Sequence, residues 1–106
     1  MWIKALGACA FLALFSSSGY AAHYSYPQVN GLQVDATTWD YPGGDATVYQ
    51  QAAADAYCRS IGSHFATNHG TVDNGNWPNG TWRFYKDGSG KFCDFCKSYM
   101  TFIDCQ

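Results

Sequence analysis

Two cysteines near the C-terminal end stand at the spacing of a redox or metal motif. The arrangement Cys93-x-x-Cys96 occurs in thioredoxin-type centres, where a helix N-terminus stabilises one thiolate. Here a glycine-rich turn at 87–90 comes before it, so the helical setting is missing. A zinc site would need His64 and His69 as further ligands, and exported thiols are expected to oxidise first. The pattern therefore favours a structural disulfide, with no metal site.

Histidine is the other residue type here that could perform catalysis. His64 or His69 could act as a general base oriented by Asp73, and with Arg83 and Lys86 the two histidines could form the set that a small secreted ribonuclease needs. The chain has no glutamate, its aspartates are scattered singly, and neither a Gly-x-Ser-x-Gly elbow nor a phosphate loop is present. We therefore favour ordinary polar roles for these residues, assign no catalytic residue, and expect no cofactor.

The segment 68–80 is rich in Asn and Gly without periodicity, which predicts a long loop, and long loops in compact domains are often functional. Aromatic rings that stack on a sugar, beside polar groups that bind its hydroxyls, are what a carbohydrate site requires. The predicted ligand-binding residues are Trp77, Tyr85, Asp73, Asn74 and Asn76.

Other interpretations of this region stay open. Trp82 and Phe84 alternate along a predicted strand and would then pack inward. Four oxygen-bearing side chains could instead bind calcium, although their spacing is not that of an EF-hand loop: Asp73, Asn74, Asn76 and Asn79. Asn79 also begins an N-glycosylation acceptor triplet, Asn-Gly-Thr.

The N-terminus has the order of residues found in a secretory signal peptide. Lys4 is followed by an apolar run over 5–15, then by small polar residues, and Gly19 and Ala21 fit the small-x-small rule for cleavage. The run is too short to span a bilayer, which argues against an uncleaved anchor. Cys9 resembles a lipobox cysteine, but most of the apolar residues follow it. We expect residues 1–21 to be removed, leaving a secreted, extracellular or periplasmic chain without stable membrane anchoring.

The mature chain, residues 22–106, has the length of one small domain, for which a hydrophobic core alone supplies little net stability. Cleavage leaves Cys58, Cys93, Cys96 and Cys105, and an even number in an exported chain predicts two disulfides. Loop entropy does not choose among the three pairings. We favour Cys58 with Cys105, which would tie a helix to the C-terminal strand and leave Cys93 with Cys96.

Charge and composition exclude one class of partner. The whole chain has a net charge of −2 with no run of either sign, whereas a nucleic-acid surface needs a basic face. Its aromatic fraction of 18% and charged fraction of 13% indicate a folded domain with some aromatic residues on the surface.

The clearest element is a helix over 47–61. Thr47 can cap it with Gln50 reaching back, four alanines favour it, and Gly62 can end it. The residues Ala54, Tyr57, Cys58 and Ile61 share one face, so we expect Cys58 to point into the core.

Strands are predicted at 32–34 after an Asn-Gly turn, and at 63–67, 81–86 and 99–105, with a turn at 87–90. The fold class is therefore α+β: one helix packed on a small, mostly antiparallel sheet with two disulfides.

The spacing Ala53-x-x-Ala56-Tyr57-Cys58-x-x-x-Gly62, Gly90-x-x-Cys93-x-x-Cys96 and Phe102-Ile103-x-Cys105 resembles a recurrent type of small secreted cysteine-rich domain. Such domains often have another cysteine pair around 39–44, which this chain lacks. The resemblance covers about half of the mature chain and implies a fold, with no activity or site residue to transfer.

These observations predict a secreted, non-catalytic binding module for an extracellular ligand, with a glycan as the favoured one. The alternatives are a secreted effector, toxin or inhibitor that acts on a protein target, and a small secreted hydrolase such as a ribonuclease. The expected partners are a glycan or a protein, and not nucleic acid.

Overall fold

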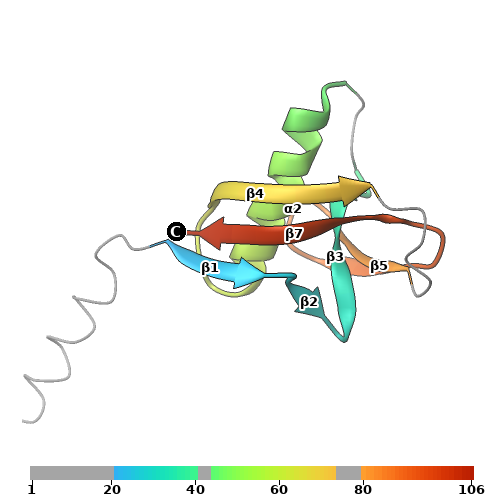
Figure 1. Ribbon diagram of the computed structural model, residues 1–106, viewed down its shortest axis with the longest axis horizontal. Coiled ribbons are helices and arrows are strands. Elements are labelled where there is room, and N and C mark those ends of the chain that lie inside the picture. The colour runs from blue at the N-terminus through green and yellow to red at the C-terminus, as the bar shows by residue number, and fades with distance from the viewer. Residues whose placement is uncertain (1–20, 41–43, 74–79) are drawn as a thin grey trace, which may run out of the picture.

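The computed structural model describes residues 21–40, 44–73 and 80–106 (Figure 1). Within these ranges it has one helix, α2 (Ala46–Ser60), and seven strands: β1 (Ala22–Ser25), β2 (Gln28–Val29), β3 (Leu32–Thr38), β4 (Ala66–Asp73), β5 (Thr81–Phe84), β6 (Gly90–Cys93) and β7 (Ser98–Cys105). Of the predicted leader 1–21, only Ala21 is among the described residues.

Helix α2 begins at Ala46, and its N-cap lies two residues before the predicted cap. The N-cap is Asp45, whose extended backbone and side-chain oxygen, which accepts from the Thr47 amide at 3.2 Å, match the geometry of this position. The prediction that Thr47 caps the helix with Gln50 is therefore wrong. The predicted end is confirmed. Gly62 has a φ of +92°, its amide donates to the Arg59 carbonyl, and the Ser63 amide donates to the Cys58 carbonyl. This pattern is a Schellman motif.

The sheet is built around β7. Strand β1 pairs with one edge of β7 and β4 with the other, both antiparallel (Figure 1). The order β1-β7-β3-β5-β6 continues the sheet, with β2 pairing with β3. Only β3 and β5 run parallel among the pairs in the described residues. The predicted class, one helix packed on a mostly antiparallel sheet, is confirmed.

The core lies between α2 and the sheet. Helix residues Ala53, Ala54, Ala56, Tyr57 and Cys58 pack against Val34, Ala66, Phe84, Met100, Ile103 and Cys105. Small alanine side chains leave room for close approach of the helix to the strands, and aromatic side chains fill the remaining volume. The prediction for the buried helix face is confirmed except at Ile61, which is 42% exposed because it lies just beyond the last helical residue.

Two strand predictions are corrected by the structure. The strand expected at 63–67 is β4, which begins at Ala66 and continues to Asp73, so the first six residues of the predicted loop 68–80 belong to a strand. Strand β6 begins at Gly90, the last residue of the predicted turn at 87–90, and the sequence pattern predicts no strand there. The turn itself is confirmed: the amide and hydroxyl of Ser89 donate to Asp87, and Gly88 has a φ of +96°.

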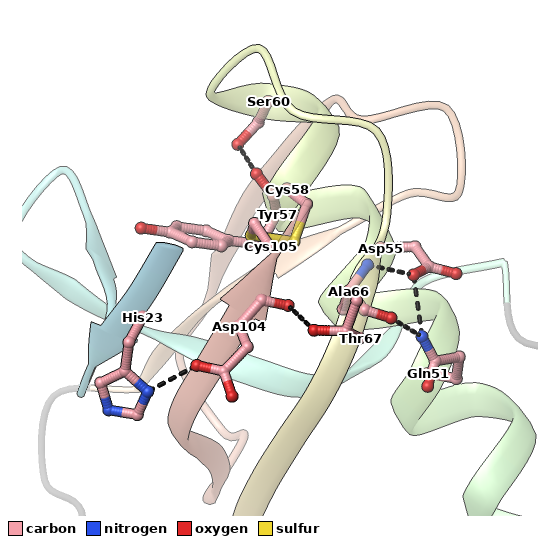
Figure 2. The surroundings of a disulfide bond; sticks show 10 residues. All are labelled: His23, Gln51, Asp55, Tyr57, Cys58, Ser60, Ala66, Thr67, Asp104 and Cys105. Atoms are coloured by element: carbon pink, nitrogen blue, oxygen red, sulfur yellow. Dashed lines mark hydrogen bonds and ion pairs between the residues drawn. A yellow bond between two sulfur atoms is a disulfide. The ribbon is translucent and has the colours of Figure 1, made fainter. Parts of the chain in front are cut away.

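Both expected disulfides are present. Cys58–Cys105 joins α2 to β7 (Figure 2), and Cys93–Cys96 closes a short loop after β6. Cys58 is fully buried, as predicted. Within the described ranges, the helix is neither long nor apolar enough to cross a membrane.

Candidate functional site

The predicted ligand-binding residues fall into three groups. Trp77, Asn74 and Asn76 lie outside the described residues, as does Asn79. Asp73 ends β4 and accepts a hydrogen bond of 2.9 Å from the Ser98 hydroxyl. Tyr85 follows β5, with its ring centroid 6.4 Å from that of Trp39. Because β7 and β3 lie between β4 and β5, the sheet does not bring Asp73 and Tyr85 together.

On the face of β3 that points away from the core, the main polar feature is a buried carboxylate. Asp35 is 0% exposed. Its Oδ1 accepts from the Thr81 hydroxyl at 2.7 Å, and its Oδ2 accepts from Arg83 Nε at 2.9 Å and from the amide and hydroxyl of Thr37 at 2.9 and 3.0 Å. A buried carboxylate is tolerated only when it is paired and hydrogen-bonded in this way. Asp35 therefore fixes the orientation of the Arg83 side chain.

The parallel pairing of β3 with β5 explains why these side chains meet. Gln33 pairs with Thr81, and side chains alternate between the faces of each strand. Thr81 and Arg83 consequently lie on the Asp35 side of the sheet, while Trp82 and Phe84 face the helix. Phe84 is buried in the core and Trp82 packs against it, which settles the open question of whether these two aromatic residues point inward.

Trp39 lies against two cations directly after β3. Its amide donates to the Phe84 carbonyl at 2.9 Å, which holds it beside β5. The Arg83 guanidinium carbon lies 5.0 Å from its ring centroid and Lys91 Nζ lies 4.8 Å from it, both within the range of cation–π attraction. Tyr85 completes the group with a ring tilted by 32° to Trp39. We call these residues, together with Asp35, the Trp39 face.

The Trp39 face offers aromatic surface and hydrogen-bond donors in one place. Trp39 and Tyr85 are half-buried, and Lys91 is exposed. Arg83 retains 22% of its side-chain exposure while Asp35 holds its Nε. Such a combination suits binding of a polar ligand with a stacking surface.

The residues considered for hydrolysis are not assembled into one site. His69 pairs with Ile103 in the β4–β7 ladder, whereas Arg83 is on β5 and bonds to Asp35. Burial lowers the pKa of His69, with the negative charge of Asp55 acting in the opposite direction. His64 is exposed, and Asp73 accepts from Ser98 rather than orienting a histidine.

Asp55, whose negative charge raises the pKa of His69 against the effect of burial, has a structural role. Its Oδ1 accepts from the Ala66 amide at 2.8 Å and from Gln51 Nε2 at 2.9 Å (Figure 2). Gln51 also donates to the Ala66 carbonyl at 2.9 Å. These bonds join α2 to the start of β4, near the Cys58–Cys105 disulfide.

The Cys-x-x-Cys motif is a disulfide within a turn. Cys93 ends β6 and Cys96 follows a turn, so neither cysteine stands at the N-terminus of a helix, as a thioredoxin-type thiolate does. In the described parts of the chain, no group of three or more His, Cys, Asp or Glu side chains is placed to hold a metal ion.

The fold and the disulfides define the chain as a small two-disulfide α+β domain, and the Trp39 face is its candidate site. No protein-family model, curated protein or solved structure matches the chain. Sequence reasoning found Tyr85 in this site but missed Asp35, Trp39 and Lys91. One signal was available: Asp35 is a lone acid among the apolar and β-forming residues of 32–38.

Proposed function

We propose that this chain is a secreted, non-catalytic binding module and that its ligand is a carbohydrate bound at the Trp39 face. Export rests on the leader at 1–21 and fits the two disulfides, which form and persist in oxidising compartments.

The observation that carries the proposal is the pairing of Trp39 with Tyr85 at the edge of a rigid polar network. Their ring centroids are 6.4 Å apart. Arg83, held by buried Asp35, lies against Trp39 and can donate to ligand hydroxyls without a large loss of side-chain freedom. Aromatic surface with fixed donors beside it is the chemistry of sugar recognition. Trp77, Asn74 and Asn76 remain predicted ligand-binding residues of the same module.

A glycan array with purified mature protein tests this proposal. Trp39→Ala and Tyr85→Ala should each weaken binding about tenfold or more, since loss of one stacked aromatic ring removes on the order of 1–2 kcal/mol. Phe65→Ala is the matched control, because Phe65 is an exposed aromatic residue whose amide donates to Gln106 at the far end of β7. Thermal melting of each variant confirms folding.

Two results decide the outcome of this test. Binding that survives both Trp39→Ala and Tyr85→Ala removes the Trp39 face as the site. If Trp77→Ala then abolishes binding, the site belongs to the predicted loop instead.

A protein target is the second candidate function, and one observation favours it. Phe92 directly precedes the Cys93–Cys96 loop and Phe95 lies within it; they are 48% and 70% exposed. A disulfide-closed loop presents apolar side chains with little ordering cost, which suits insertion into an apolar pocket of a protein. Loss of a co-purifying extracellular protein in Phe95→Ser, but not in the control Val48→Ser on exposed helix surface, would support this function over the first.

A further inference from the structure

Positive charge is concentrated in the segment 83–97, which contains Arg83 and Lys91. Of the five Lys and Arg residues beyond the leader, four lie between residues 83 and 97, whereas six of the eight aspartates lie outside that range. The chain as a whole has a net charge of −2. The segment 83–97 therefore has four cations and two aspartates of its own, and two aspartates from outside it contact it: Asp35 pairs with Arg83, and Asp40 accepts from the Lys86 amide.

Two of these cations lie directly opposite each other. Arg83 on β5 pairs with Lys91 on β6 in the antiparallel ladder. Like charges in this position destabilise a sheet, because the side chains of opposite residues lie about 5 Å apart. Both side chains also lie against the Trp39 ring, so their proximity is maintained beyond the backbone pairing.

The structure compensates only one of the two charges. Asp35 neutralises Arg83 through a 2.9 Å ion pair. Among the described residues, the other ion pair is His23–Asp104, so Lys91 has the π-face of Trp39 and no carboxylate partner there. Lys91 is also exposed. The Trp39 face thus has one unneutralised, accessible positive charge next to an aromatic ring.

We propose that the Trp39 face selects acidic saccharides, with Lys91 as the residue that determines this specificity. The carboxylate of a uronic acid or the sulfate of a sulfated sugar pairs with Lys91, and the sugar ring contacts Tyr85. Arg83, held by Asp35, is the second donor to the anion. This inference rests on the proposed carbohydrate-binding function and adds the class of sugar.

The test measures the affinity of the mature protein for three polysaccharides by isothermal titration calorimetry. Polygalacturonate carries carboxylates, heparin carries sulfates, and dextran is neutral. We expect binding to one or both acidic polymers and at least tenfold weaker binding to dextran. Comparison of the two acidic polymers distinguishes carboxylate from sulfate. Added salt should weaken the acidic interactions, since exposed charges are screened.

Two lysine variants separate a specific site from general attraction. Lys91→Gln should lower affinity for the acidic polymer about tenfold, and Lys91→Arg should restore most of it, because a charge-assisted hydrogen bond contributes on that scale. Lys97→Gln is the matched control: it removes the same charge from an exposed lysine beyond the disulfide loop and should change affinity less than threefold.

The outcomes distinguish this inference from the proposed function. Equal affinity for dextran and the acidic polymers, unchanged in Lys91→Gln, overturns the inference and leaves carbohydrate binding intact. Equal losses in Lys91→Gln and Lys97→Gln overturn it too, because the attraction is then diffuse. If the wild-type protein binds none of the three polymers or any glycan on the array, the proposed function itself fails.

Discussion

Arg83 Nε donates a 2.9 Å hydrogen bond to Oδ2 of Asp35, so a side chain of β5 neutralises a carboxylate that is completely buried on β3. The two residues are 48 positions apart in the chain. Thr81 donates to the other carboxylate oxygen. The parallel pair of strands is therefore joined by side chains as well as by the backbone, and the donor that lies against Trp39 is oriented by the same bond.

Removal of the buried carboxylate should destabilise the domain strongly. Asp35→Ala leaves Arg83 without its partner and two threonine hydroxyls unpaired. We expect a loss of about 3–5 kcal/mol in the free energy of unfolding, the usual result when one member of a buried pair is removed. Urea denaturation followed by tryptophan fluorescence measures it. If Asp35→Ala does not fold, Asp35→Asn provides a milder variant.

Two further variants calibrate that result. Thr81→Val removes a single neutral donor with nearly the same shape, so we expect a loss of about 1–3 kcal/mol. Asp94→Asn changes an exposed aspartate of the disulfide loop and should stay within about 0.5 kcal/mol of wild type. A loss in Asp35→Asn no larger than that in Asp94→Asn would contradict the structural role of Asp35.

The two disulfides should contribute unequally to stability. Cys58–Cys105 joins residues 47 positions apart, and Cys93–Cys96 joins residues 3 apart. A cross-link restricts the unfolded chain more when the loop is longer, which gives about 4 kcal/mol for the first and about 2 kcal/mol for the second. Urea unfolding of the Cys58→Ala/Cys105→Ala and Cys93→Ala/Cys96→Ala double variants measures both. The opposite ranking would show that loop length does not govern their contributions.

Much of the fold follows from local signals. Alanines across 52–56 and the glycine at 62 are strong helix and stop signals, and they place α2 almost correctly. The predicted start differs from the observed one because Asp45 and Thr47 are both suitable caps. Asp45 caps the helix because its own backbone is extended and its carboxylate can reach the Thr47 amide.

Most of strand β4 cannot be predicted from the sequence because its pairing is irregular. The ladder with β7 shifts register between Ala66 and Asn68 and again between Gly70 and Thr71. Each bulge interrupts the alternation of side chains that identifies a strand in a sequence. Gly70 also lies close to β7: a Cβ there would be 2.6 Å from the Phe102 ring, which would have to shift to admit it. Only the partner strand explains these features.

The candidate site was largely beyond sequence reasoning. Tyr85 was found because aromatic residues near a polar loop are a recognisable pattern. The connection of Asp35 with Thr81 and Arg83 depends on the parallel pairing of β3 and β5, across 46 and 48 positions of sequence. No local periodicity encodes that pairing, so Trp39 and Lys91 could not be placed beside Arg83.

Protonation of His69 should make stability fall in mild acid. Burial lowers the pKa of His69 in the folded protein below the ordinary histidine value of about 6.5. Above that value His69 is neutral in both states and its contribution is complete. As the pH falls below it, the unfolded chain binds a proton that the folded chain binds less readily, so the free energy of unfolding decreases.

Urea titrations between neutral pH and mild acid test this dependence. The decrease in stability should be smaller in His69→Gln than in wild type. His64→Gln, which changes an exposed histidine five residues away, should keep the wild-type slope. A wild-type slope in His69→Gln, or stability that rises as the pH falls, would contradict the expected role of His69.

Gly80 should tolerate a side chain less well than Gly31, although both have a positive φ, +73° and +80°. At Gly31 a Cβ meets nothing within 4 Å, so Gly31→Ala adds only backbone strain of about 1–2 kcal/mol.

At Gly80 a Cβ would also collide with the carbonyl oxygen of Cys93 and lie 2.8 Å from the Phe92 ring. Because that carbonyl belongs to the backbone of the adjoining strand, it cannot rotate away, and relief of the collision must separate β5 from β6. We therefore expect Gly80→Ala to lose at least about 1 kcal/mol more than Gly31→Ala in urea unfolding. Equal losses in the two variants would mean that β5 and β6 are not packed this closely at Gly80.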